Sequence, residues 1–201
     1  MESTFNIYKH NEFVKVHIFN TFGIRILIMN RVILGLGTNL GKRENNLDNA
    51  IEGIEKHVGH VLKCSSIYET EPWGFKAKDE FLNMVVLVET DLIPGVLLEQ
   101  ILTIESSLGR VRSNERYSSR LIDIDILLYD DIIVDYQNLK IPHPLLHERR
   151  FVLVPLCEIA PEVVHPILKR TMAELLGICE DHGVVTKYKM SGHDMAWSYK
   201  S

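Results

Sequence analysis

The sequence predicts an α+β fold: a ferredoxin-like βαββαβ sandwich with extra C-terminal strands and a short helix. Two observations support this prediction. Short runs of β-branched and aliphatic residues alternate with two longer stretches of helical spacing, and the connections between them carry glycine and proline. The chain has 201 residues and is 46% hydrophobic, which is enough for one sizeable core.

The first predicted elements are a strand, a helix and a second strand. Residues 31–37 (RVILGLG) are apolar and end in glycine, which favours a strand followed by a turn. Apolar residues then recur at helical spacing over 44–57, and Gly59 is a suitable C-terminal stop. Residues 61–70 (VLKCSSIYET) predict the second strand.

The remaining elements repeat this pattern. Residues 81–90 (FLNMVVLVET) predict a strand, which follows a connection longer than a tight hairpin needs. Residues 95–108 have one apolar helical face, and 120–128 (RLIDIDILL) predict the closing strand. A weaker helical pattern occupies 171–178. The connection at 71–80 is long enough to carry functional residues.

Composition excludes several classes of protein. The chain has 22 Lys and Arg against 27 Asp and Glu, and this net charge of −5 argues against a general nucleic-acid binder. The three cysteines lack metal-binding spacing, so we expect reduced thiols and a cytoplasmic location. We found neither a signal-peptide pattern nor a membrane-spanning stretch, and we expect no membrane partner.

The closing strand contains an unusual pair of carboxylates, Asp123 and Asp125. Side chains two residues apart point to the same face of a strand, so these like charges should repel. A cation between them, a basic neighbour or water on that face would relieve the repulsion. Four arginines precede or begin this strand, at Arg110, Arg112, Arg116 and Arg120.

These residue types together favour a metal–nucleotide site. Guanidinium groups form paired hydrogen bonds with phosphate oxygens, and Mg²⁺ prefers a few carboxylates together with phosphate oxygens and water. Ordinary surface salt bridges are the alternative for any single Arg–Asp pair. The glycines of residues 35–41 (GLGTNLG) lack the lysine and hydroxyl of a P-loop, so nucleotide binding would depend on arginine side chains.

Residues 116–127 (RYSSRLIDIDIL) resemble the pattern R-x-[GA]-x-R-x-x-D-[LIV]-D-[LIV]-[LIVM] of the 6-hydroxymethyl-7,8-dihydropterin pyrophosphokinase family of folate biosynthesis, with Ser118 as the single departure. The resemblance extends from Arg31 to Pro166. Other matching blocks are GTNLG (37–41), SSIYETEPWG (65–74), FLNMVV (81–86), IESSLGRVR (104–112) and IPHPLLHERRFVLVPLCEIAP (141–161).

The resemblance implies transfer of pyrophosphate from ATP to the hydroxymethyl group of a reduced pterin, with release of AMP and two Mg²⁺ ions as cofactors. By position, Asp123 and Asp125 would hold both ions, and Arg110 and Arg120 would contact the moving phosphates. The residues implied for ATP are Glu105, Arg112, Arg116, Tyr117, Ile126, His143 and Arg149. Those implied for the pterin are Thr70, Pro72, Trp73, Phe81, Asn83 and Phe151.

The residues implied for the pterin are of types that can bind a flat, polar ring. A flat bicyclic ring is held well by stacking on aromatic side chains, and an Asn offers both a donor and an acceptor to its edge. Core packing is the alternative for each aromatic residue. For His143 the alternative is a hydrogen-bonded loop histidine after Pro142.

The remaining expectations concern organisation and rival functions. We expect residues 1–30 to be an N-terminal extension that is poorly ordered or not native, and residues 31–201 to form one domain that acts as a monomer. ATP and the reduced pterin are the expected partners. An RNA-binding module and an inactive nucleotide-binding scaffold are the rivals. The first would need exposed sheet aromatics in a block of the K/R-G-F/Y-G/A-F type, and the sequence contains no such block. AMP release would separate an enzyme from both rivals.

Overall fold

The structure, a computed structural model, describes residues 3–9, 12–18, 24–74, 79–110 and 119–189. The strands are β1 (Ser3–Lys9), β2 (Glu12–Ile18), β3 (Ile24–Ile28), β4 (Asn30–Thr38), β5 (His60–Cys64), β6 (Tyr68–Thr70), β7 (Phe81–Thr90), β8 (Asp123–Tyr129), β9 (Val134–Tyr136), β10 (Leu139–Ile141) and β11 (Val185–Lys187). The helices are α1 (Arg43–His57), α2 (Pro94–Ser107), α3 (Arg150–Ile159), α4 (Met172–Gly177) and the 3-10 turn η1 (Leu146–Glu148).

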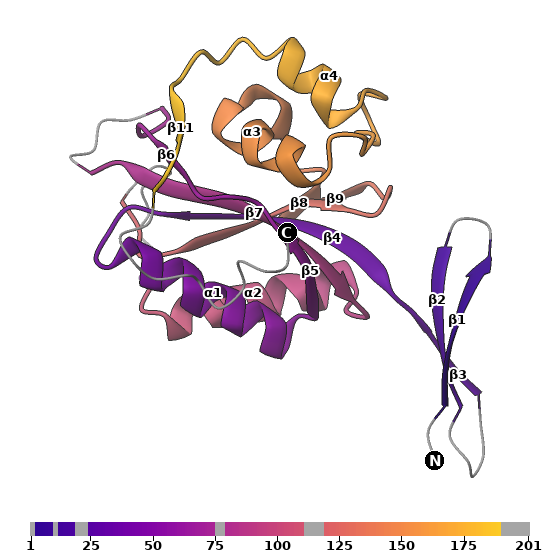
Figure 1. Ribbon diagram of the computed structural model, residues 1–201. Helices are drawn as coiled ribbons and strands as arrows, with labels where there is room; N and C mark the ends of the chain where they lie inside the picture. Colours follow the sequence, from indigo (N-terminus) through magenta and orange to yellow (C-terminus); the bar gives the residue numbers. More distant parts are fainter. Residues whose placement is uncertain (1–2, 10–11, 19–23, 75–78, 111–118, 190–201) are drawn as a thin grey trace.

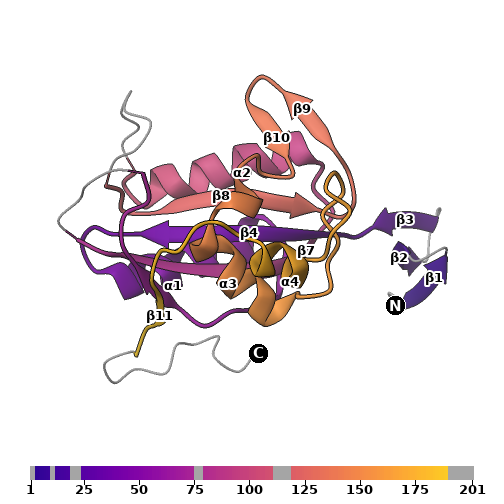
Figure 2. The same ribbon diagram turned by 90° about the horizontal axis from the view of Figure 1, so that it is seen from above.

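The main sheet is antiparallel at every pairing and is built around β7. Its strands follow the order β11-β6-β7-β4-β8, and β5 also pairs with β7. Figure 2 shows β8, β4 and β7 running side by side through the middle of the molecule. The predicted α+β class is therefore confirmed.

The predicted strand 61–70 is in fact two strands, β5 and β6, separated at Ser65. The Ser65 backbone N–H donates to the carbonyl oxygen of Val85 at 2.9 Å, and its Oγ accepts from the Val85 N–H at 2.9 Å. These two hydrogen bonds satisfy the buried backbone groups at the point where the strand is interrupted. After the break, β6 pairs with the start of β7, where Thr70 lies opposite Phe81.

Helices cover both faces of the main sheet (Figure 1): α1 and α2 lie on one face, and α3 and α4 on the other. The first face buries Leu47 and Ile101 against the sheet, and the second buries Leu153 and Leu156. Burial on both faces explains why the middle parts of β4, β7 and β8 are largely apolar. Helix α3 is an element that the sequence analysis did not predict.

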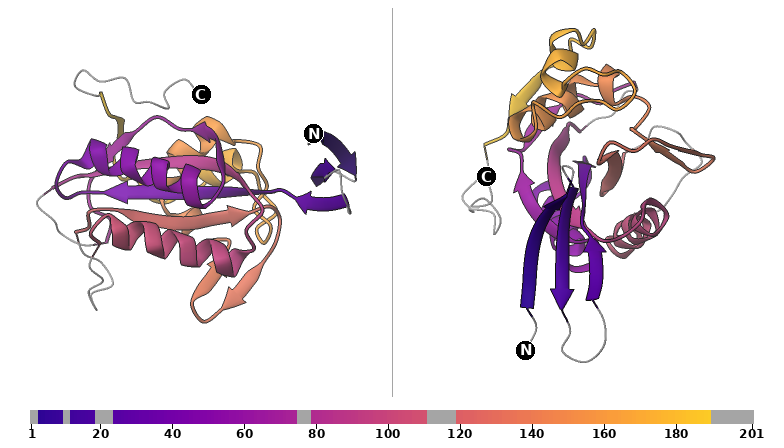
Figure 3. Two further views of the ribbon diagram at one scale, coloured as in Figure 1. Left: turned by 90° about the horizontal axis from the view of Figure 1, so that it is seen from below. Right: turned by 90° about the vertical axis from the view of Figure 1, so that its right-hand side faces the viewer.

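The N-terminal strands β1, β2 and β3 form a separate antiparallel sheet. It projects from the end of β4, away from the main sheet (Figures 1 and 3). The expectations that residues 1–30 are an extension, poorly ordered or not native, and that residues 31–201 form a single domain remain predictions.

Among the described residues, none of the helices combines the length and the apolar character needed to cross a bilayer.

Glu158 ties α3 to the edge of the main sheet. Its carboxylate accepts hydrogen bonds from the Ser66 N–H at 2.8 Å, the Ser66 hydroxyl at 2.7 Å and the Tyr68 hydroxyl at 3.1 Å. Lys187 of β11 lies 3.5 Å away. Burial opposes ionisation of Glu158, but the Ser66 and Tyr68 hydrogen bonds outweigh it, and the pKa is lowered.

We expect Glu158→Gln to lower the free energy of unfolding by about 1 kcal/mol at pH 7, because hydrogen bonds to a charged acceptor are the stronger ones. A lowered carboxyl pKa stabilises the fold above the unfolded value, here 4.5, and that stabilisation disappears as pH falls through the folded pKa. Urea unfolding at pH 7 and pH 3 should show the difference shrinking with acid. The exposed Glu162→Gln is the control, and a difference independent of pH would contradict this prediction.

Candidate active site

A cavity of about 380 Å³ opens on the α3 face of the main sheet. Its floor is formed by neighbouring positions of β4, β7 and β8. Its walls come from the residues around Thr70 and Trp73 and from the segment 143–152, which leads into α3. The cavity thus joins segments that are far apart in the sequence, and most of the predicted site residues line it.

Asp123 and Asp125 both line this cavity, as strand alternation predicts. The intervening Ile124 and the following Ile126 face the opposite core. Burial, and then the charge of Asp123, raise the pKa of Asp125 to about 7. Two negative charges are therefore disfavoured at the cavity floor, and a bound cation would favour the ionised form of both carboxylates.

Two glycines of β4 keep this floor open. Gly35 pairs with Asp125 and Gly37 with Asp123 in the register of β4 and β8, and both glycines line the cavity. A Cβ atom at Gly37 would lie 3.0 Å from Oδ1 of Asn83. A larger residue would therefore press on Asn83 and fill space beside the carboxylates.

Two arginines pair with Asp123, and a buried glutamate holds one of them. Arg120 forms an ion pair with one carboxylate oxygen, and Arg110 Nη1 lies 2.6 Å from the other. Arg110 also pairs with Glu105 of α2, whose side chain is only 3% exposed and accepts the Ile124 N–H at 2.8 Å. Burial raises the pKa of Glu105. Through these two contacts, Glu105 of α2 holds Arg110 and the backbone of β8 in place.

Aromatic rings gather at the other end of the cavity. The ring centroids of Trp73 and Phe151 are 6.4 Å apart with an interplanar angle of 56°. The Arg149 guanidinium carbon lies 4.9 Å from the Trp73 ring centroid and 5.7 Å from that of Phe151. Phe81 also lines the cavity. These rings offer a stacking surface for a flat ligand.

Polar side chains face the cavity beside these rings. Asn83 is 7% exposed, and its Nδ2 donates to the Thr70 hydroxyl at 2.7 Å, which fixes the orientation of the amide. Burial, and then the charge of Arg149, lower the pKa of His143 to about 4. The ring is therefore neutral at pH 7. Its Nδ1 accepts the Leu145 N–H at 3.2 Å, which leaves the proton on Nε2.

Not every predicted site residue reaches the cavity. The side chains of Pro72, Glu105 and Arg110 are absent from its lining, and Ile126 is buried in the core beneath α1 and α2. The predicted ATP residues Arg112, Arg116 and Tyr117 lie outside the described residues.

Sequence reasoning missed the roles of Gly35 and Gly37. The signal was available, because glycine within a strand often marks a close approach of another group.

Comparisons with known proteins agree with this geometry. The family model described as 7,8-dihydro-6-hydroxymethylpterin-pyrophosphokinase (HPPK) matches residues 33–161. The chain is 42% identical over 146 residues to the 2-amino-4-hydroxy-6-hydroxymethyldihydropteridine pyrophosphokinase of Aquifex aeolicus, covering 73% of this chain and 90% of that protein. It is 43% identical over 157 residues to the protein of the same name from Methylorubrum extorquens, covering 78% and 98%.

A solved structure supports the fold. Plasmodium falciparum HPPK-DHPS matches with a TM-score of 0.62 at 19% identity, over 74% of this chain and 44% of that chain. The chain thus spans less than half of that longer protein, and the likeness concerns the fold alone. The family match and the two relatives show that the chain belongs to the HPPK family, whose members are pyrophosphokinases of folate biosynthesis.

Proposed function

We propose that this protein transfers pyrophosphate from ATP to the hydroxymethyl group of 6-hydroxymethyl-7,8-dihydropterin in an Mg²⁺-dependent reaction that yields AMP and the pterin diphosphate. The observation that carries the proposal is that one cavity has paired carboxylates at one end and aromatic rings with a buried amide at the other. A reaction that transfers pyrophosphate from a metal-bound triphosphate to an alcohol on a flat ring needs both ends.

The carboxylate end fits Mg²⁺. Asp123 and Asp125 face the same space, and burial, and then the charge of Asp123, raise the pKa of Asp125, an effect that a bound divalent ion would oppose. Among the residues that the structure describes, no three His, Cys, Asp or Glu side chains gather around one possible ion position. The two ions that we propose would therefore take phosphate oxygens and water as their further ligands, which suits Mg²⁺. Bound there, they would neutralise charge on the phosphates.

The cationic residues would hold the triphosphate. Arg120, Arg149 and His143 line the cavity, and a neutral His143 can donate its Nε2 proton to a phosphate oxygen. Arg149 Nε is buried without a hydrogen-bond partner among the described residues, so its N–H can donate a hydrogen bond to a phosphate oxygen on binding. We propose the same task for Arg110, Arg112 and Arg116, with Tyr117 as a further contributor to the ATP site. Glu105 would contribute by holding Arg110, and Ile126 by packing beneath the strand that carries Asp125.

The aromatic end would hold the pterin. We propose that Phe151, Phe81 and Trp73 supply stacking surface and that Asn83 meets the polar edge of the ring, with its amide oriented by Thr70. Pro72 would shape the same wall.

The chemistry then requires positioning more than acid–base catalysis. The pterin hydroxyl attacks the β-phosphorus of ATP and releases its proton to water, the bond from that phosphorus to the oxygen that bridges it to the α-phosphate breaks, and AMP leaves. The arginines compensate the charge that spreads over the transferred group. No described side chain needs to act as a strong base.

The proposal is tested by product identity. Incubation with ATP, Mg²⁺ and the reduced pterin should release AMP in an amount equal to the pterin diphosphate. ADP in place of AMP would indicate transfer of one phosphate and would contradict the proposal. Binding of ATP without any product would favour the rival nucleotide-binding scaffold.

Three further proposals concern context. The strand order β8-β4-β7-β5 fits the ferredoxin-like sandwich that the sequence predicts. The scattered cysteines support a reducing, cytoplasmic setting. We also propose that the protein acts as a monomer on its two small substrates, without nucleic-acid or membrane partners.

A further inference from the structure

Arg43, the first residue of α1, bridges the two ends of the connection between β6 and β7. Its Nη2 lies 2.9 Å from Oε1 of Glu69, and its Nη1 donates to the carbonyl oxygen of Glu80 at 2.8 Å. Glu69 directly precedes Thr70, and Glu80 directly precedes Phe81. One guanidinium therefore holds both the point where the chain leaves the sheet and the point where it returns.

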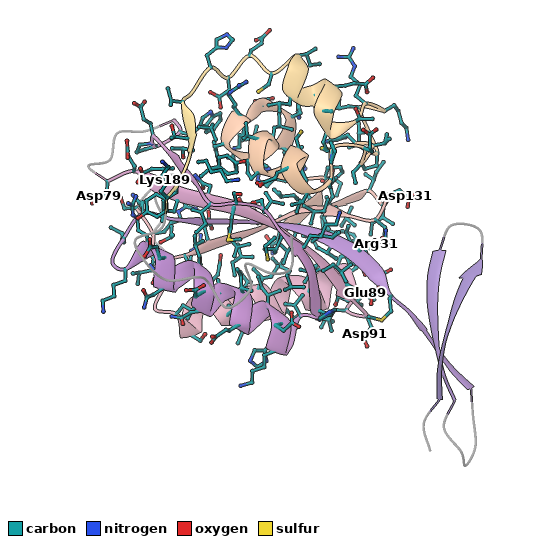
Figure 4. All side chains as sticks on the ribbon, viewed as in Figure 1. Arg31, Asp79, Glu89, Asp91, Asp131 and Lys189 are labelled. Atoms are coloured by element: carbon teal, nitrogen blue, oxygen red, sulfur yellow. The ribbon has the colours of Figure 1, made fainter. Side chains whose placement is uncertain are left out.

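The C-terminal part of the chain supports this guanidinium. The Arg43 guanidinium carbon lies 5.8 Å from the Tyr188 ring centroid. The Tyr188 N–H in turn donates to the carbonyl oxygen of Ile67 at 2.9 Å, which continues the pairing of β11 with β6. In Figure 4, Asp79 and Lys189, the neighbours of Glu80 and Tyr188, are labelled at the same end of the molecule.

The strand ends that Arg43 holds carry residues of the proposed pterin site. Thr70 pairs with Phe81 in the register of β6 and β7, and Thr70 orients Asn83 through the 2.7 Å hydrogen bond. All three of these residues line the cavity. A shift of either strand end would therefore move the stacking ring and the amide relative to one another.

We propose that Arg43 is a positioning residue for the pterin, which it does not touch. This inference rests on the proposed function. A partly exposed ion pair contributes little to stability, since the Arg43 and Glu69 side chains are 25% and 29% exposed. Loss of Arg43 should therefore weaken pterin binding more than it lowers the stability of the fold. A lysine has the charge but not the fork that reaches two separate oxygens, so it should replace Arg43 only in part.

The test compares Arg43→Met and Arg43→Lys with Lys140→Met. Lys140 forms a more exposed ion pair, at 2.6 Å with Asp135, on the hairpin of β9 and β10, outside the cavity lining. Arg43→Met should raise KM for the reduced pterin about tenfold, because small displacements of binding groups are costly. Its KM for ATP should stay within about twofold, and its melting temperature within about 3 °C. Arg43→Lys should be intermediate and Lys140→Met unchanged.

Hydrogen exchange gives a second measurement that needs no substrate. Backbone amides of residues 79–84 should exchange faster in Arg43→Met than in the wild type, and Lys140→Met should match the wild type. An unchanged pterin KM in an active Arg43→Met enzyme, or unchanged exchange, would overturn the inference and leave the proposed function intact. A wild-type protein that forms no AMP would overturn the proposed function instead, and exchange would still report whether Arg43 holds the strand ends.

Discussion

Replacing Asp125 with asparagine is expected to lower the turnover number about 1,000-fold, because several kcal/mol of charge stabilisation by bound metal would be lost. Asparagine keeps the shape of the side chain and removes its charge. Asp125 lies on the cavity floor beside Asp123, and the pKa of about 7 indicates that its charge is poorly compensated there. Initial rates at saturating ATP, pterin and Mg²⁺ would measure the effect.

The same substitution should not weaken the fold. Burial and the charge of Asp123 disfavour the ionised form of Asp125, so an uncharged amide should raise the free energy of unfolding at pH 8 in the absence of divalent ions. Asp135→Asn, at a 72% exposed carboxylate, is the control and should change neither quantity by much. A near-normal rate for Asp125→Asn would eliminate the proposed metal site.

The parts of the fold with strong local patterns could be predicted from the sequence. Residues 81–90 were predicted as a strand and form β7 with the same bounds, because the run is apolar and flanked by polar connections. The alternation around Ile124 also placed Asp123 and Asp125 on one face. Such features depend only on residues that are close together in the sequence, so they can be predicted before the fold is known.

Helix α3 shows why other parts could not be predicted. Its sequence, RFVLVPLCEI, combines β-branched residues with Pro155, a combination that disfavours helices in isolation. Its helical state depends on burial of Leu153 and Leu156 against the sheet. Tertiary packing therefore overrides local preference, and the position of Phe151 at the cavity follows from it.

The contacts around the candidate site could not be predicted from the sequence for a related reason. Glu105 was assigned to the nucleotide by resemblance, whereas the structure places it under β8 with Arg110 and the Ile124 N–H. Arg43 meets Glu80 across 37 residues of chain. No periodicity encodes a pairing between such distant positions, so only the folded chain reveals them.

Arg120→Ala is expected to lower kcat about 100- to 1,000-fold while KM for the pterin changes little, because a preorganised cation acts on charge that develops in the transition state. Arg120 is the cation that both lines the cavity and pairs with Asp123 through its side chain. It can therefore neutralise the transferred group and also orient the adjacent carboxylate. Steady-state kinetics with each substrate varied in turn would separate kcat from the two KM values.

Two further variants separate charge from geometry. Arg120→Lys keeps the cation but loses the planar fork, so it should recover only a part of the lost rate. Arg170→Ala removes an exposed arginine near α4 and should leave kcat unchanged. Full recovery by lysine would mean that net charge alone matters at this position. A loss of less than about threefold in Arg120→Ala, under 1 kcal/mol, would remove Arg120 from the transition state.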